Sequence, residues 1–255
     1  MFMRRHVPCV GLALRILWGL KAITIANRLR LWRKSVHLYL AFLAFTDRER
    51  PREQLRWAMI SAVLSALYDY DTDWVRTPDP ETSIFFKQMD RLLDADPDRQ
   101  SGRVIARELF RQDWSRNLSA HGLERGSVSL HFYRLVIGSR WMSRYSDKQI
   151  DVFGRKLQIV DDILDLERDR EAGDLNCFVH IDQATKEVLA REARAFFVSP
   201  FFRALEENSP RIYGFLRRTC ERKLRTIAPD PSILLRPAQA GIFSLILLVT
   251  VLLIR

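Results

Sequence analysis

Cysteine is scarce in this 255-residue sequence, and its three cysteines form no recognisable site. Cys9, Cys177 and Cys220 are odd in number and lack the spacing of metal-binding motifs. This pattern excludes a disulfide framework and a zinc site, and it favours a reducing compartment. The five histidines are scattered, and no Ser/His/Asp or Cys/His set indicates nucleophilic catalysis.

Glycine and proline are also few, at ten each, and alternating runs of Val, Ile and Thr are rare. Apolar residues instead recur at spacings of three and four, which is typical of helices. Because 47% of the residues are hydrophobic, the chain can bury a full core. We therefore predict an all-α protein. The expected helices run to about residue 45, from Pro51 to about 74, and over 81–94, 102–117, 124–144 and 146–173. Two or three more are expected over 183–197 and 200–226.

Acidic residues are outnumbered, 31 against 41 basic ones, and seven of the basic residues are lysine and 34 arginine. The resulting net charge of +10 suits an anionic partner, such as a phosphate group, a nucleic acid or an acidic membrane surface. The chain has no recognisable nucleic-acid motif, and its basic residues are scattered rather than gathered in one aromatic patch. We therefore expect no nucleic-acid partner.

Both ends of the chain are more apolar than its middle. Residues 237–254 are 18 residues without a charge, and the basic segment 217–225 precedes them. A helix that is apolar on every face must be covered on every face, so we predict a single-pass tail anchor with the main domain on the cytoplasmic side. A buried C-terminal helix is the alternative.

The N-terminal residues 1–29 start like a signal sequence, but Arg15 and Lys21 interrupt the apolar part and no cleavage site is evident. We predict an amphipathic helix that packs on the domain or lies on the membrane surface. A second transmembrane helix is the weaker alternative. The sequence thus divides into an N-terminal helix at 1–29, a helical domain at 30–230 and an anchor at 237–254.

Residues 158–178, QIVDDILDLERDREAGDLNCF, place three aspartates four residues apart on one side of a predicted helix. They are Asp161, Asp165 and Asp169, and they border the apolar stripe of the same helix. Carboxylates at this spacing repel one another, most strongly in a low dielectric. A cation is therefore expected beside them.

A second acidic group, Asp69 and Asp73 with Asp71 between them, lies in a stretch from residue 57 to 75 that has no lysine or arginine. Grouped carboxylates that the local sequence leaves without a counter-charge suit Mg²⁺. A solvated helix face is the simpler alternative. A calcium loop is excluded, because its glycine and glutamate positions hold Trp74 and Pro80.

The segment from Asp161 to Asp169 resembles the second metal motif of class I terpene synthases. That motif has an acid or amide, a Ser, Thr or Asp four residues later, a basic residue at the seventh following place and an acid at the eighth. With Gln158 before it and residues 173–176 after it, the segment is most similar to large-terpene synthases related to tetraprenyl-β-curcumene synthase. It is also similar to the corresponding helix of squalene and phytoene synthases.

A looser match joins Tyr133, Arg134 and Gly138 to the Tyr…Ala-Gly helix of squalene and phytoene synthases, with close helix packing at Gly138 as an equal alternative. Two features depart from these families. Asp174 follows Gly173 where squalene and phytoene synthases carry arginine, and the interval from Asp69 to Asp161 is shorter than usual. Because of this short interval, a homo-oligomer in which a second copy of the chain completes the cavity is one alternative.

The resemblance implies an isoprenoid-synthase-like helical bundle around a central cavity, with Mg²⁺ ions that bridge the enzyme and a prenyl diphosphate. Its implied metal-binding and catalytic residues are Asp69, Asp73, Asp161, Asp165 and Asp169. The implied diphosphate contacts are Arg168, Arg134 and Tyr133, although Arg168 is equally suited to a salt bridge with its acidic neighbours. The aromatic residues that would face the carbocation are Tyr68, Phe132 and Tyr133.

The expected function is that of a Mg²⁺-dependent terpene synthase that ionises a long-chain prenyl diphosphate and releases pyrophosphate. Head-to-head condensation and chain elongation are the alternatives within the same superfamily. A catalytically inactive, membrane-anchored helical scaffold is the alternative from another class.

Overall fold

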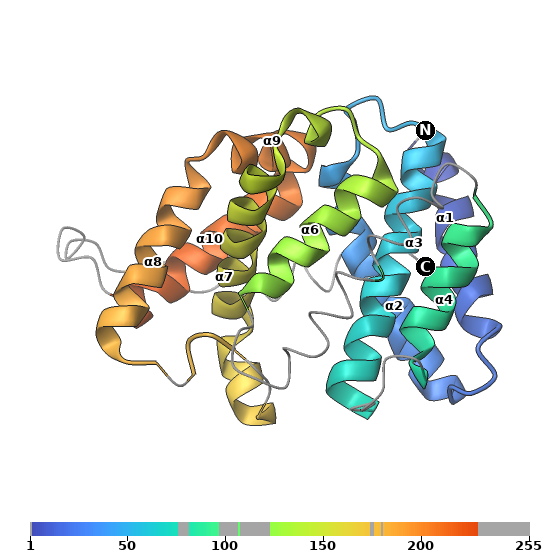
Figure 1. Ribbon diagram of the computed structural model, residues 1–255, viewed down its shortest axis with the longest axis horizontal. Helices are drawn as coiled ribbons and strands as arrows, with labels where there is room; N and C mark the ends of the chain where they lie inside the picture. Colours follow the sequence, from blue (N-terminus) through green and yellow to red (C-terminus); the bar gives the residue numbers. More distant parts are fainter. Residues whose placement is uncertain are drawn as a thin grey trace.

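The computed structural model describes residues 2–75, 82–96, 107, 123–173, 176–179 and 181–228, and every regular element in these ranges is helical (Figure 1). The predicted all-α class is thereby confirmed. The predicted anchor at 237–254 lies outside the described residues, as does the expected helix at 102–117 apart from residue 107. None of the helices in the described ranges is both long enough and apolar enough to cross a membrane.

The N-terminal half packs three helices side by side and adds a fourth. They are α1 (Phe2–Trp18), α2 (Ile25–Phe42), α3 (Arg52–Asp69) and α4 (Ile84–Asp94). The N-terminal helix predicted at 1–29 is shorter than expected, because a turn at residues 19–24 separates α1 from α2. Thr24 begins α2 by accepting a hydrogen bond from the backbone N–H of Asn27.

The C-terminal half contains five further helices. They are α6 (Glu124–Ile137), α7 (Asp147–Ala172), α8 (Gln183–Phe197), α9 (Pro200–Asn208) and α10 (Pro210–Ile227). Helix α6 packs along α7 and also contacts α3, while α7 contacts α8 and α10 on its other side. Helices α6 and α7 therefore join the two halves of the molecule, as Figure 1 shows.

Helix α7 begins and ends where the sequence predicts. Ser146 and Gln149 form a capping box at its start, with each side chain accepting a hydrogen bond from the other residue's backbone N–H. Gly173 ends it in the left-handed conformation, at φ 70°. Both signals are local, so neighbouring helices do not alter them.

One other expected helix differs from the structure. Helix α6 ends at Ile137, because Gly138 adopts the left-handed conformation at φ 67° and caps it. Gly138 is therefore a helix terminus and not a mid-helix packing residue, which overturns the helix expected at 124–144. The two or three helices expected over 183–226 are three, since the chain breaks at Ser209 and restarts with Pro210 in the first turn of α10.

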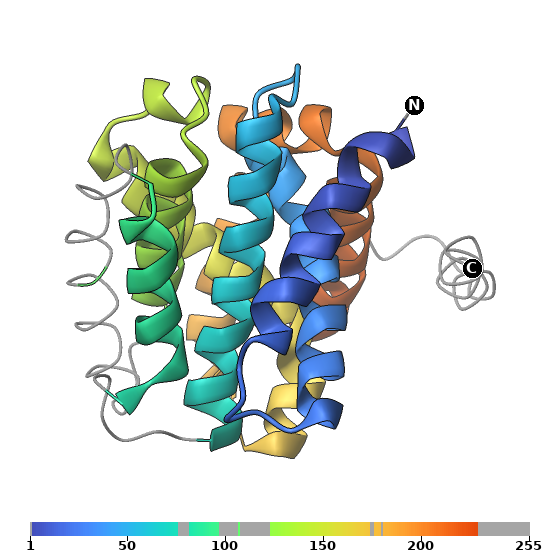
Figure 2. The ribbon, with the colours of Figure 1, turned by 90° about the vertical axis from the view of Figure 1, so that its right-hand side faces the viewer.

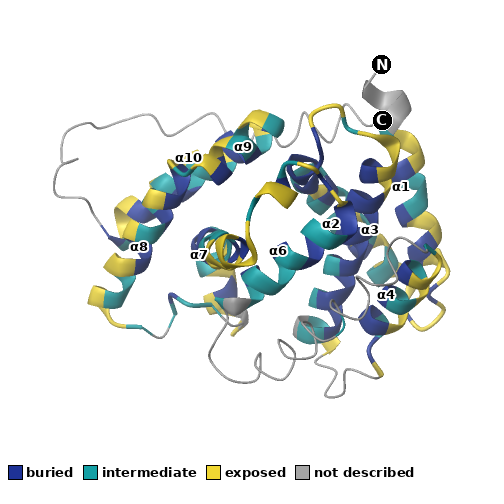
Figure 3. Cartoon of the chain, turned by 45° about the horizontal axis from the view of Figure 1, so that its top comes forward, coloured by how far each residue is buried: buried dark blue, intermediate teal, exposed yellow. Residues whose placement is uncertain are grey.

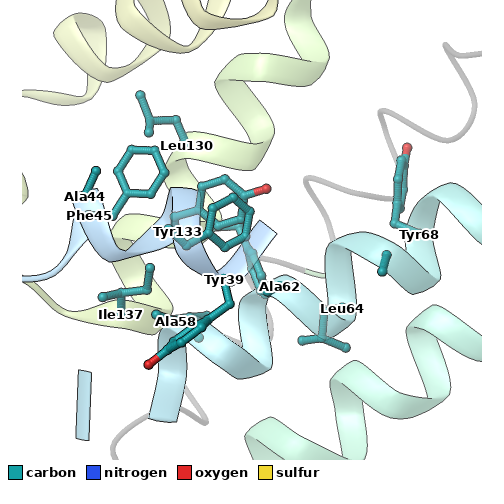
Figure 4. Close-up of a cluster of buried hydrophobic side chains, with 14 of the residues drawn as sticks. Tyr39, Ala44, Phe45, Ala58, Ala62, Leu64, Tyr68, Leu130, Tyr133 and Ile137 are labelled. Carbon is teal, nitrogen blue, oxygen red and sulfur yellow. The ribbon is translucent and has the colours of Figure 1, made fainter. Parts of the chain in front are cut away.

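Helix α3 is the central element of the core. Thirteen of its 18 residues are buried, so neighbours cover it on nearly every face (Figure 3). Beside it, the Tyr133 ring on α6 stacks on Phe45 at a centroid distance of 5.5 Å (Figure 4). Tyr133 also contacts Phe42 at the end of α2, at a centroid distance of 4.3 Å. These rings fix α6 against the end of α2, and the hydrogen bond between Tyr133 and Ser65 joins α6 to the C-terminal half of α3.

Candidate functional site

Helix α3 ends at Asp69 and continues as a π-helical turn over Tyr70–Val75. Such turns are rare and often lie at functional sites. Within the turn, Asp71 is buried and accepts hydrogen bonds from the Ser83 hydroxyl at 2.6 Å and the Phe85 backbone N–H at 2.8 Å. Asp71 therefore anchors the start of α4. Burial raises the pKa of this carboxyl group above its usual range.

Asp161, near the middle of α7, is solvent-exposed, yet its surroundings desolvate the carboxylate. This desolvation, together with the negative charges of Asp165, Asp162 and Asp69, raises the pKa of Asp161 to about 7. The charge of Asp69 on α3 thus acts on Asp161 on α7. We call the charged region around Asp69, Asp161 and Asp165, between the end of α3 and the middle of α7, the recess.

Asp69 is neutralised by two basic residues from other helices. Its carboxylate oxygens lie 2.5 Å from Lys34 Nζ on α2 and 2.6 Å from an Arg125 guanidinium nitrogen on α6. The expectation that the chain leaves this acid without a counter-charge is therefore wrong for Asp69. The stretch from 57 to 75 supplies no cation, but the tertiary structure brings two from distant parts of the sequence.

Arg168 pairs with two aspartates of its own helix, at 2.8 Å from Asp165 and 2.9 Å from Asp169. Asp169 is buried and also accepts a hydrogen bond from the Asn176 side chain at 2.9 Å. Burial raises the pKa of Asp165, and the charge of Arg168 opposes that effect. The Arg168 side chain is 68% exposed, so it is free to exchange these partners for a ligand.

Asp162 was not among the predicted site residues, but it organises the C-terminal half of α7. It is buried and accepts hydrogen bonds from the Gln158 side chain at 2.8 Å and from the Cys177 backbone N–H at 2.9 Å. Asn176 also donates to the Asp162 backbone carbonyl at 2.7 Å. The residues that flank the segment from Asp161 to Asp169 therefore tie the chain after α7 back onto the helix beside the recess.

The structure does not bring every predicted site residue to the recess. Arg134 lies near the C-terminal end of α6, where it donates to Asp147 and to the Tyr145 carbonyl at 3.0 Å, beside the start of α7. Arg125, which the sequence did not single out, is the arginine of α6 that pairs with Asp69. The side chain of Asp73 lies outside the described residues.

Aromatic residues line the side of the recess formed by α3 and α6. The Tyr133 hydroxyl hydrogen-bonds with Ser65 at 2.9 Å, and burial raises the pKa of Tyr133 to about 12. The Tyr68 ring lies under the Arg125 guanidinium, 5.0 Å from ring centroid to Cζ, and Phe132 is buried. Tyr68 therefore borders the charged groups, whereas Phe132 belongs to the core.

Lys34 and Arg125 are the residues that sequence reasoning missed. Neither lies in a motif, and each is one basic residue among 41. Only the packing of α2 and α6 against α3 selects them. The recess thus combines three carboxylates, Asp69, Asp161 and Asp165, with the three cations Lys34, Arg125 and Arg168.

No protein-family model, no curated protein and no solved structure matches this chain. Within the described part of the chain, no three acidic, histidine or cysteine side chains lie close enough together to share one metal ion. Mg²⁺ does not require such a group, since it commonly binds one or two carboxylates, several waters and a substrate phosphate.

Proposed function

We propose that this protein is a Mg²⁺-dependent enzyme of the class I terpene synthase type, which ionises a prenyl diphosphate in the recess between α3 and α7. The observation that carries the proposal is the state of Asp161. Desolvation by its surroundings and the carboxylates of both helices raise its pKa to about 7 although the charge of Arg125 opposes them, and in the described residues it has no hydrogen-bond or ion-pair partner. A bound cation would remove this electrostatic penalty.

The donor set suits Mg²⁺ and a diphosphate together. Asp161 and Asp165 would hold a metal ion through hard carboxylate oxygens, and Asp69 would join them once released from its cations. When bound, Mg²⁺ offsets the negative charge that develops on the leaving diphosphate. Lys34, Arg125 and Arg168 would then turn from the aspartates to the diphosphate oxygens. In the protein without a ligand, the ion pairs thus hold the carboxylates and the cations close to the positions from which they would bind Mg²⁺ and the diphosphate.

The aromatic side of the recess supports the same proposal. Tyr68 presents a ring beside Arg125, and Tyr133 closes the wall toward the core. Aromatic faces stabilise positive charge through the ring quadrupole, and a wall without charged groups excludes water from a carbocation. Both features suit a substrate that becomes cationic when its C–O bond breaks.

The test is to incubate the full chain, in detergent, with Mg²⁺ and prenyl diphosphates of increasing chain length, and to measure pyrophosphate release and hydrocarbon products. Asp161→Asn and Asp165→Asn should each reduce release by about a hundredfold or more. Asp151→Asn is the matched control, because Asp151 lies on the same helix but is exposed and pairs with His131. A product from one substrate indicates elimination or cyclisation, and a product from two indicates condensation.

A helical scaffold without turnover is the second candidate, and the ion pairs of the recess favour it. Lys34 and Arg125 on Asp69, with Arg168 on Asp165 and Asp169, already neutralise most of the acids. If well-folded protein releases no pyrophosphate from any chain length, the enzyme proposal fails and the scaffold is preferred.

A further inference from the structure

The outer side of α1 carries an exposed apolar row. Val7, Leu14 and Trp18 are 63%, 40% and 44% exposed. Their spacings of seven and four residues place them within about 40° of one line along the helix. Another side of α1 holds the fully buried Ala13 and Leu17, which pack into the core. Figure 2 views the molecule from this side and shows α1 along the outside of the bundle.

The start of α2 extends this apolar surface. Arg28 donates to the Trp18 carbonyl at 3.3 Å and to the Ile23 carbonyl at 2.7 Å, which holds the first turns of α2 beside the end of α1. Ile25 and Leu29 on these turns are exposed as well. Half of the large exposed hydrophobic side chains in the described ranges therefore belong to α1 and α2. Such a concentration is typical of an interaction surface.

The charge around this surface has one sign. The first 46 residues contain eight arginines and lysines and no aspartate or glutamate. Three of these basic residues, Arg15, Lys21 and Arg33, are exposed on α1, on α2 and in the turn between them, whereas Arg30 stacks on the Trp74 ring at 3.8 Å. The partner should therefore be both apolar and anionic.

We propose that α1 and the first turns of α2 dock on the surface of a bilayer that contains acidic lipids. Val7, Leu14 and Trp18 enter the boundary between headgroups and acyl chains, where tryptophan is enriched in membrane proteins. Arg15 and Lys21 extend to the lipid phosphates while their stems lie against the apolar row. Helix α1 lies on the bilayer and does not span it, because its inner face is part of the protein core.

The docking is independent of the proposed enzymatic function, so the test uses full-length protein without substrate. The predicted anchor at 237–254 would attach the chain to vesicles by itself, and the measurement must therefore report on α1 alone. Tryptophan emission is recorded with vesicles of brominated phosphatidylcholine, with and without brominated phosphatidylglycerol. The emission of Trp18 should be quenched on the anionic vesicles, and Trp18→Phe should remove that quenched component. Trp141→Phe is the control that retains it.

Two pairs of substitutions test the apolar and the charged parts. Val7→Ser with Leu14→Ser should reduce the quenching of Trp18, whereas Val152→Ser with Val188→Ser, at exposed sites on α7 and α8, should not. Arg15→Gln with Lys21→Gln should lower the ratio of docked to undocked protein on anionic vesicles by about fivefold for each charge removed.

Equal quenching of the wild type and Trp18→Phe would overturn the proposal. It would also be overturned if both serine pairs behaved alike, or if neutral and anionic vesicles quenched Trp18 equally. A concentration-dependent dimer that Val7→Ser with Leu14→Ser dissociates, without quenching by lipid, would assign the surface to a second copy of the chain instead.

Discussion

Helices α6 and α7 cross at a pair of glycines, and this crossing offers a sharp test of the packing. Gly126 and Gly154 are both buried. A Cβ added at Gly126 would lie 2.0 Å from the Gly154 carbonyl oxygen and 2.8 Å from the Gln158 Cβ, whereas ordinary contacts begin at 3.4 Å. The obstructing oxygen belongs to the backbone, so Gly126→Ala requires the two helices to separate.

The cost of Gly126→Ala follows from two opposing effects. Overpacking in a well-packed core costs about 1–3 kcal/mol, and the upper end applies here because backbone atoms cannot rotate away. Replacing a helical glycine by alanine increases the free energy of unfolding by about 1 kcal/mol, because alanine has the higher helix propensity. We therefore expect a net loss of about 2 kcal/mol in the free energy of unfolding, and a fall in Tm of about 4–8 °C for a domain of this size.

Urea denaturation followed by circular dichroism measures this loss. Gly11→Ala on α1 is the matched control, because a Cβ there meets nothing within 4 Å. That substitution should raise stability by about 0.5–1 kcal/mol. The double variant Gly126→Ala with Gly154→Ala should cost less than the sum of its parts, since one separation of the helices relieves both clashes.

The crossing also matters for the recess. Arg125, which holds Asp69, precedes Gly126, and Gln158, which holds Asp162, touches the added Cβ. If Gly126→Ala were as stable as the wild type, or more stable, the close approach of α6 and α7 would be refuted. The placement of Arg125 beside α3 would then lose its main support.

Three further predictions concern single side chains. Burial and like charges raise the pKa of Asp161 from 3.8 to about 7, so the folded protein keeps a proton that the unfolded chain has released, and the free energy of unfolding falls as pH rises through this window. In urea titrations, Asp161→Asn should therefore stabilise metal-free protein more at about pH 7.5 than at about pH 4. The expected difference is about 1–2 kcal/mol, because solvent screens this exposed group. An equal effect of the substitution at both pH values would refute the pKa shift. Asp71→Ala should cost about 2–3 kcal/mol, because it leaves two buried donors unpaired, whereas Asp182→Ala at the exposed start of α8 should cost clearly less in the same assay. Arg125→Gln should raise KM for a prenyl diphosphate in the pyrophosphate-release assay, whereas Arg134→Gln should leave KM unchanged. If only Arg134→Gln raised KM, Arg134 and not Arg125 would be the diphosphate contact.

Part of the candidate site follows from sequence spacing alone. A period of four residues places Asp161, Asp165 and Asp169 on one side of a helix whatever surrounds it. Their burial differs, however, from exposed Asp161 to buried Asp169, because Asp169 is held by Arg168 and by Asn176 from the chain after α7. The environment of Asp71 likewise could not be predicted from sequence spacing. It lies between two predicted ligands in the sequence, but the start of α4 turns it into a buried anchor.

The sequence by itself determined the helical class and the bounds of α7, because the capping box at Ser146 and the left-handed Gly173 act within a few residues of each helix end. Only the tertiary structure decided which charges meet. Lys34, Asp69 and Arg125 come from three helices, and they form ion pairs because the buried faces of α2, α3 and α6 pack together. Helix packing is set by the summed burial of many apolar side chains, so no local pattern around any of the three residues reveals its partners.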